Sequence, residues 1–176
     1  MSNYRRFRVP GGTYFFTVVT HQRRPFFRHP ANVQRLRTAI RRIRDTHPFH
    51  IDAMVILPDH LHALWTLPKD DDDYTRRLRL VKSLFTQSAP DLPAERARRP
   101  GEGAVWQRRY WEHVIRDGED FRRHVDYIHY NPVKHGLVAH PREWPYSSFH
   151  RAVQRGWYPP HWGASEPETV NGLEFE

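Results

Sequence analysis

Residues 50–67, HIDAMVILPDHLHALWTL, hold two apolar arms that flank a Pro-Asp pair. Two such arms around a tight turn predict a β-hairpin. Because successive side chains of a strand point to opposite faces, Leu61 and Trp65 share one face of the second arm and His60 and His62 share the other. The two imidazoles are then about 6 to 7 Å apart along one face. Such a pair can bind one cation or one phosphate, or it can consist of ordinary buried histidines with satisfied hydrogen bonds.

Five further segments surround the hairpin in an alternating order. Residues 13–20, TYFFTVVT, are apolar at most positions, which suits a central strand covered on both faces. Apolar residues at three- and four-residue steps predict helices over 33–47, 74–85 and 117–132, the last one stopped by its final proline, and residues 105–116 predict another strand. The order βαββαβ predicts an α+β fold, namely a ferredoxin-like or RRM-like antiparallel sheet with helices on one face, plus an additional C-terminal helix.

The second predicted helix separates apolar from basic positions. We expect its apolar residues to face the core and its basic residues, Arg76, Arg77, Arg79 and Lys82, to point outward. The acidic run Asp70–Asp73 lies where this helix begins. Stabilisation of the positive helix N-terminus explains the run better than a carboxylate metal site does.

The length of 176 residues favours a single domain. We expect this domain over residues 1–150, a basic loop over 89–104, and a loosely ordered tail over 151–176. The sequence shows no signal peptide and no apolar run long enough to span a membrane. It contains no cysteine, which excludes disulfides, thiol nucleophiles and thiolate metal sites and fits a reducing cytoplasm.

The chain is strongly basic, with 28 Lys and Arg against 20 Asp and Glu, a net charge of +8 and a pI near 10.2. A polyanion such as nucleic acid is therefore the expected partner, although basic charge can also serve solubility alone. DNA binding through this charge should weaken with salt. The candidate DNA-binding residues are Arg5, Arg6, Arg8, Arg23, Arg24, Lys82, Arg108 and Arg109.

The last predicted helix carries a polar stripe. Arg123, Tyr127 and Asn131 follow one another at four-residue intervals, so they project from nearly the same side of the helix. Val125 and Ile128 hold another side to the core. The stripe can therefore face the sheet where the two histidines lie, and an amide oxygen and a phenol would then join the imidazoles.

Three segments carry a resemblance to a known family. ILPDHLHALW, WEHVIRDGEDFRRHVDYIHYNPVKHGLV and WPYSSF, in this order and at these separations, resemble the one-tyrosine HUH transposases of the insertion-sequence-200 type. Within that family the chain is most similar to the REP-associated tyrosine transposases, bacterial proteins linked to repetitive extragenic palindromes (REPs). The resemblance runs from about residue 4 to residue 150.

The resemblance implies a role for each matching residue. His60 and His62 match the metal-binding histidine pair, and Tyr127 matches the nucleophile. The third ligand position, a glutamine in the insertion-sequence relatives, holds Asn131 here. Because the asparagine side chain is shorter, the resemblance supports the position of Asn131 beside the metal site more firmly than direct ligation of the metal. Tyr130 is the rival nucleophile, but it points to another part of the helix.

Two neighbours of the expected nucleophile are candidate helpers. His124 lies three residues before it and can assist proton transfer, although a solvated or phosphate-contacting role suits it better. Arg123, one turn before the tyrosine, is the second candidate.

The implied reaction is metal-dependent cleavage and rejoining of single-stranded or hairpin DNA through a 5′-phosphotyrosine, and its partner is DNA from repetitive extragenic palindromes. The expected cofactor is Mg²⁺, which Mn²⁺ can replace. The resemblance also places the protein in the bacterial cytoplasm, near the nucleoid. Two other functions stay open, a hairpin-binding protein that does not cleave and a nuclease that uses water. A monomer with the tyrosine acting in its own chain and a homodimer with the tyrosine acting in its partner also both stay open.

Overall fold

The computed structural model describes residues 7–90, 92 and 105–175. Arg5, Arg6 and most of the expected basic loop lie outside these residues. The strands are β1 (Thr13–Val19), β2 (His50–Ile56), β3 (His60–Thr66) and β4 (Trp111–Val114). The α-helices are α1 (Pro30–Thr46), α2 (Tyr74–Ser88), α3 (Gly118–Lys134) and α4 (Phe149–Gln154). Short 3-10 helices cover His21–Arg23, Phe26–Arg28, Pro141–Glu143 and Glu168–Val170.

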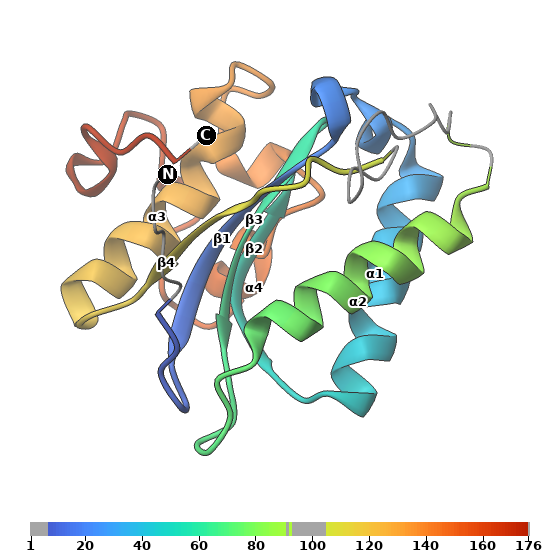
Figure 1. Cartoon of the computed structure of the whole chain (residues 1–176). Coiled ribbons are helices and arrows are strands. Elements are labelled where there is room, and N and C mark those ends of the chain that lie inside the picture. The colour runs from blue at the N-terminus through green and yellow to red at the C-terminus, as the bar shows by residue number, and fades with distance from the viewer. Residues whose placement is uncertain (1–6, 91, 93–104, 176) are drawn as a thin grey trace, which may run out of the picture.

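The four strands form one antiparallel sheet in the order β2-β3-β1-β4 (Figure 1). This order places β1 and β3 in the centre, and β2 and β3 form the predicted hairpin. Helices α1 and α2 cover one face of the sheet, and α3 lies on the other (Figure 1). The predicted α+β fold with an additional helix is therefore confirmed.

Each face of the sheet has its own apolar core. On the α1/α2 face, Phe16 and Trp65 pack with residues of both helices such as Leu36. On the α3 face, Phe15 and Leu64 pack with residues of α3, and the helix closes over them. Because neighbouring residues of a strand point to opposite faces, β1 and β3 supply both cores at once. The expected burial of β1 on both faces is confirmed.

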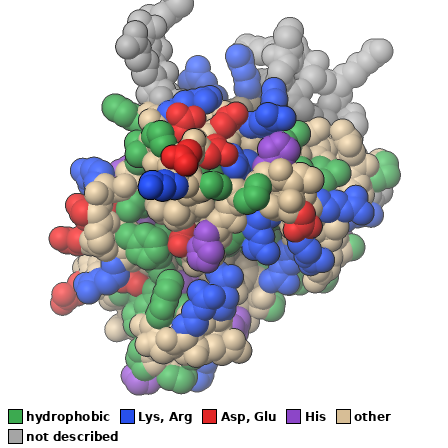
Figure 2. All heavy atoms as spheres, turned by 90° about the horizontal axis from the view of Figure 1, so that it is seen from below, with side chains coloured by type: hydrophobic (Ala, Val, Ile, Leu, Met, Phe, Trp, Pro, Cys, Tyr) green, Lys and Arg blue, Asp and Glu red, His purple; other side chains and the backbone are tan. Residues whose placement is uncertain are grey.

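Arg77 contradicts the expectation that the basic residues of α2 all point outward. It is almost fully buried, with its guanidinium bonded to Asp71 at 2.6 Å and to the backbone oxygens of Pro48 at 2.9 Å and Asp73 at 3.0 Å. A buried guanidinium is tolerated only when its donors are satisfied, as they are here. The acidic run has the predicted capping role, since Asp73 accepts a bond from the Arg76 amide at the start of α2. Figure 2, which views the molecule from below, shows a cluster of acidic side chains in its upper part with basic ones beside it, and further acidic side chains at the left edge.

Pro132 does not stop α3, contrary to the prediction. The helix continues to Lys134 and ends in a Schellman motif, where Gly136 has φ of +64°. The amide of Gly136 bonds the Val133 oxygen at 2.8 Å, and the amide of the next residue, Leu137, bonds the Pro132 oxygen at 3.0 Å. The left-handed glycine, rather than the proline, therefore ends the helix.

Residues of the C-terminal tail contact α3 and β1. Helix α4 crosses the expected boundary at residue 150. Further along, Arg123 donates a bond to the Thr169 oxygen at 3.2 Å and Lys134 donates one to the Leu173 oxygen at 2.8 Å. The Phe175 oxygen accepts a bond of 2.6 Å from the Thr17 hydroxyl on β1. No helix among the described residues combines the length and apolarity that crossing a membrane would require.

Candidate active site

His60 and His62 lie side by side on the α3 face of β3, as strand alternation predicts. They are 1% and 0% exposed, and their ring centroids are 4.9 Å apart at an interplanar angle of 81°. The Nδ1 atom of His60 pairs with Asp59 at 2.6 Å, and that of His62 pairs with the Thr17 hydroxyl at 2.9 Å. Each ring is thereby oriented through Nδ1, while both Nε2 atoms are buried with no hydrogen-bond partner. This is the arrangement in which histidines ligate a metal through Nε2.

The electrostatics of His62 favour the neutral form that a metal ligand requires. Burial lowers the pKa of His62 well below its usual value, and the electrostatic effects of His60, His135 and Lys134 lower it further. Burial alone would raise the pKa of Asp59, but its bonds with His60 and Arg23 outweigh this effect and lower it. Asp59 therefore stays ionised as the partner of His60.

Helix α3 brings Tyr127 to the histidines, and it also carries the buried Asn131. Tyr127 is 1% exposed, and its ring centroid lies 5.2 Å from that of His62. The Lys134 ammonium lies 4.9 Å from the centroid of the tyrosine ring. Asn131 is fully buried, and neither its Oδ1 nor its Nδ2 atom has a hydrogen-bond partner. The predicted approach of the polar stripe to the histidines is thus seen for Tyr127.

Unpaired polar atoms in a protein interior are costly and therefore informative. Here His60, His62 and Asn131 contribute two ring nitrogens and a side-chain amide, all buried. Two imidazole nitrogens and an amide oxygen form a mixed nitrogen and oxygen donor set, which suits a divalent cation such as Mn²⁺. The residues present therefore fit a metal ion. Such an ion would coordinate buried nitrogen and oxygen atoms that have no hydrogen-bond partner in the fold.

A small pocket of about 290 Å³ reaches His60 from outside. Its wall includes Arg23, Arg28 and His135, and the His135 ring lies 5.2 Å from that of His60. Positive side chains at the entrance suit a phosphate group. Arg24, also a candidate for DNA contact, lies nearby in sequence and bonds the Gln22 side chain at 3.4 Å.

His124 is buried rather than solvated, contrary to one of the two roles expected for it. It is 3% exposed, its Nδ1 pairs with the Asp120 backbone oxygen at 2.8 Å, and its ring stacks on that of His113 at 4.7 Å. Burial alone would raise the pKa of Asp120, but bonds with His113 and the Arg116 amide lower it to about 2. The ligand atoms of His113, Asp120 and His124 lie within 4.8 Å of one another, which makes them a second group able to hold a metal. We did not predict this cluster; the i, i+4 pair Asp120 and His124 was its only sequence signal.

The other predicted neighbours of Tyr127 lie away from it. Arg123, a candidate helper, bonds the C-terminal segment through Thr169. Tyr130 packs with its ring 6.5 Å from that of Trp162, on another part of α3, as predicted. Burial and the nearby Glu166 raise its pKa.

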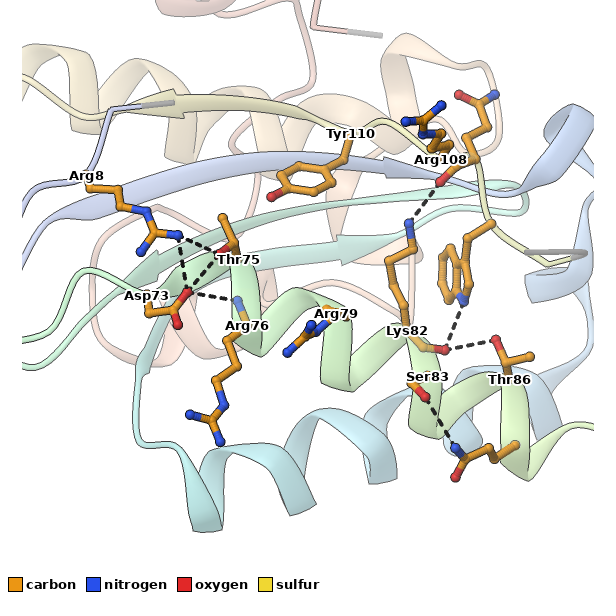
Figure 3. A pocket seen from close by; sticks show the side chains of 13 residues that line it. Arg8, Asp73, Thr75, Arg76, Arg79, Lys82, Ser83, Thr86, Arg108 and Tyr110 are labelled. Carbon is orange, nitrogen blue, oxygen red and sulfur yellow. Dashed lines mark hydrogen bonds and ion pairs between the residues drawn. The ribbon is translucent and has the colours of Figure 1, made fainter. Parts of the chain in front are cut away.

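The remaining candidates for DNA contact line a different region. Arg8, Lys82 and Arg108 border a pocket of about 720 Å³ between α2 and the segment that leads into β4 (Figure 3). Arg8 pairs with Asp72 at 3.5 Å, and Lys82 bonds the Gln107 oxygen at 2.9 Å. Arg109 is exposed next to this pocket in sequence. The predicted basic residues thus divide between the histidine site and a pocket on the α1/α2 side.

Comparison with known proteins places this geometry in context. Residues 9–131 match the family model described as "Transposase IS200 like". A REP-associated tyrosine transposase from Escherichia coli strain K12 is 46% identical over 172 residues, which cover 98% of this chain and 97% of the relative. A solved structure described as a REP-associated tyrosine transposase bound to a REP hairpin matches with a TM-score of 0.82 at 44% identity, covering 99% of this chain and 98% of that one. These likenesses extend over both β3 and α3.

Proposed function

The chain belongs to the IS200-like transposases, within them to the REP-associated tyrosine transposases, and on this premise we propose that it cleaves and rejoins single-stranded DNA beside a palindromic hairpin. The observation that carries the proposal is the position of Tyr127 against His62, next to buried ring nitrogens without partners. The solved relative, described as bound to a REP hairpin, supports hairpin DNA as the substrate.

In the proposed reaction the Tyr127 oxygen attacks the scissile phosphorus. A bond forms between them, the bond from phosphorus to the 3′ oxygen breaks, and the products are a 5′-phosphotyrosine and a free 3′-OH. One phosphoester replaces another, so the reverse attack by a 3′-OH rejoins the strand without an external energy source. The phenol loses its proton during the attack, and the leaving 3′ oxygen takes up a proton to become the 3′-OH. For a free tyrosine with a pKa near 10, this ionisation costs about 4 kcal/mol at pH 7.

The chain's own residues prepare this step. His60 and His62, oriented by Asp59 and Thr17, and Asn131 would hold the divalent ion. When bound, such an ion stabilises the charge that develops on the phosphate and the leaving oxygen. The Lys134 ammonium above the tyrosine ring favours negative charge at the same place.

The arrangement supports action of the tyrosine in its own chain. Tyr127 contacts the histidine of the same molecule, so no second copy is needed to assemble the residues. We therefore propose a monomer as the catalytic unit.

A second candidate function is hairpin binding without cleavage. The burial of the Tyr127 phenol under the C-terminal residue Phe175 favours this function. Tyr127 is 1% exposed, and the ring centroid of Phe175 lies 5.0 Å from that of Tyr127. DNA can reach Tyr127 only if this cover moves.

The test is covalent capture of DNA. The protein is incubated with an oligonucleotide that carries a REP hairpin and a single-stranded tail, with Mn²⁺, Mg²⁺ or EDTA, and separated on a denaturing gel. We expect a protein–DNA band with either metal, none with EDTA and none for Tyr127→Phe, whereas the matched control Tyr130→Phe keeps the band. Cleavage without any covalent band would favour a nuclease that uses water. Hairpin binding without cleavage would favour the second candidate.

A further inference from the structure

The backbone carbonyl of Phe175, near the end of the chain, is joined to His62 through one side chain of β1. The Thr17 hydroxyl lies 2.6 Å from the Phe175 oxygen and 2.9 Å from Nδ1 of His62. Thr17 and His62 are 2% and 0% exposed. These three groups therefore form one short hydrogen-bond chain that links the C-terminal segment to the candidate metal site.

The chemistry of the three groups fixes the direction of both hydrogen bonds. A carbonyl oxygen only accepts, and a threonine hydroxyl carries a single hydrogen. Thr17 therefore donates to the Phe175 oxygen, and this leaves the hydroxyl oxygen as an acceptor toward His62. Nδ1 of His62 must then carry a hydrogen and donate it to Thr17.

A hydrogen on Nδ1 prepares the opposite nitrogen of the His62 ring for a metal. A neutral imidazole carries one hydrogen, so the other nitrogen has a lone pair. That nitrogen, Nε2, is buried and has no hydrogen-bond partner. The other tautomer would place the hydrogen on Nε2, where it would exclude a cation.

His60 reaches the same state without help from the C-terminal segment. Its Nδ1 pairs with the Asp59 carboxylate at 2.6 Å, and an ionised carboxylate only accepts. The Thr17 hydroxyl differs from this carboxylate because it can either donate to an imidazole nitrogen or accept from one. The tautomer of His62, unlike that of His60, therefore depends on what else takes the Thr17 hydrogen.

Contacts on both sides of the chain end hold the Phe175 carbonyl in place. The Phe175 ring stacks on Trp111 of β4 at 4.7 Å and on His124 of α3 at 4.9 Å. Two residues earlier, the Leu173 oxygen accepts a bond of 2.8 Å from Lys134. Figure 1 shows this end of the chain beside α3. The acceptor for Thr17 is thus a fixed part of the fold.

We propose that the Phe175 carbonyl, by taking the Thr17 hydrogen, fixes the tautomer of His62 in which Nε2 binds a divalent ion. The inference rests on the proposed function for the presence of the ion. Phe175 is then a positioning residue that acts through Thr17. Water in place of the carbonyl would not have this effect, because water also donates and would let Thr17 turn its hydrogen toward His62. Docking of the C-terminal segment and metal binding therefore stabilise each other.

The first test determines the two tautomers in metal-free protein. Long-range ¹H–¹⁵N NMR spectra in EDTA at about pH 8, where histidine is neutral, distinguish a hydrogen on Nδ1 from one on Nε2. His60→Phe and His62→Phe assign the two signals. We expect Nδ1–H for both rings in the full chain. In a chain that ends at Leu173, His62 should become a mixture of tautomers while His60 stays unchanged. A chain that lacks only Glu176 is the matched control, since Phe175 then keeps an oxygen acceptor.

Titration calorimetry with Mn²⁺ measures the consequence for metal binding. Loss of a group that orients a ligating histidine typically costs about 10- to 100-fold in metal affinity. We expect Thr17→Val to bind Mn²⁺ about tenfold more weakly than the wild type, and the chain that ends at Leu173 about three- to tenfold more weakly. Thr17→Ser should restore the affinity. Within Thr17→Val, shortening the chain should have no further effect, because the connection to His62 is already broken.

Two results would overturn the inference. One is a shortened chain with the wild-type tautomer of His62 and with unchanged or tighter Mn²⁺ binding. The other is an effect of shortening that persists in full within Thr17→Val, which would mean that the tail acts by another route. The shortened chain lacks only terminal residues, so it tests the inference even where Thr17→Val fails to fold. Failure of the proposed function is recognised separately, because it removes the covalent band of the wild type and leaves the tautomers of the metal-free protein unchanged.

Discussion

The two faces of the sheet differ in whether their buried polar side chains have hydrogen-bond partners. On the α1/α2 face, the buried Arg77 has its guanidinium bonded to Asp71 and to backbone oxygens. On the α3 face, the Nε2 atoms of His60 and His62 and the amide of Asn131 have no partner. Trp65 Nε1 is also unpaired on the first face, but as an isolated donor among rings. The buried guanidinium of the first face is thus paired, whereas the buried ring nitrogens and amide of the α3 face are not.

The largest expected effect concerns His62. His62→Phe keeps a ring in the same buried position but removes the Nε2 donor, so we expect covalent capture of DNA to fall at least 1,000-fold while the melting temperature changes little. Titration calorimetry with Mn²⁺ should also show loss of binding. The matched control is His50→Phe at the exposed start of β2. Retained Mn²⁺ binding in the His62 variant would remove this residue from the metal site.

Arg77 should show the opposite behaviour. Arg77→Ala leaves Asp71 and several carbonyl oxygens without their buried partner, and the free energy of unfolding should fall by about 3 to 5 kcal/mol. Urea denaturation measures this loss. The protein that remains folded should still capture DNA. If capture vanished in fully folded Arg77→Ala protein, the separation of the two faces would be wrong.

His129 tests a buried polar group of α3 that does have partners. It bonds the Ser148 hydroxyl at 2.8 Å, and burial, with a smaller effect of Arg151, lowers its pKa to about 3. The unfolded chain, with a pKa near 6.5, takes up the proton first as the pH falls. The stabilisation is therefore complete above pH 6.5 and is lost progressively toward pH 3.

The expected loss from this residue between pH 7 and pH 5 is about 2 kcal/mol. Unfolding measured at both pH values in the wild type and in His129→Gln should show a smaller pH dependence in the variant. An identical pH dependence in the two proteins would show that His129 is not neutral when folded.

Asn131 should give only a small effect on stability. Asn131→Leu replaces an unpaired buried amide with an apolar group of similar size, so the free energy of unfolding should rise by about 1 kcal/mol. Covalent capture should fall at the same time. A large loss of stability would instead mean that the amide is paired in the folded protein, which would weaken the contrast between the two faces.

The sequence was most informative where spacing alone decides geometry. Strand alternation placed His60 and His62 together, and helical periodicity placed Tyr127 and Asn131 on one side of α3. The sequence was least informative where the position of a side chain depends on a partner far away in the sequence. Arg77 occupies a core-facing position of α2, and the partners that allow a charge there include the carbonyl oxygens of His47 and Pro48, which follow α1 and lie far away in the sequence.

The contacts of the C-terminal tail also could not be predicted from local sequence patterns. Phe175 meets β1 through a bond to Thr17, a contact between residues 158 positions apart that no local pattern contains. The cluster of His113, Asp120 and His124 likewise combines β4 with α3, and no local pattern links His113 to the i, i+4 pair Asp120 and His124. Residues that meet only through the tertiary fold could therefore not be predicted.

The proposed reaction depends most directly on which atom of the protein becomes covalently bonded to the DNA. The covalent product formed with the hairpin and its tail can be digested with trypsin, which releases residues 124–134 as one peptide containing both Tyr127 and Tyr130. Fragmentation in the mass spectrometer then locates the phosphate. The account predicts a 5′-phosphodiester on Tyr127, and attachment to Tyr130, or an unmodified peptide after complete cleavage, would contradict it.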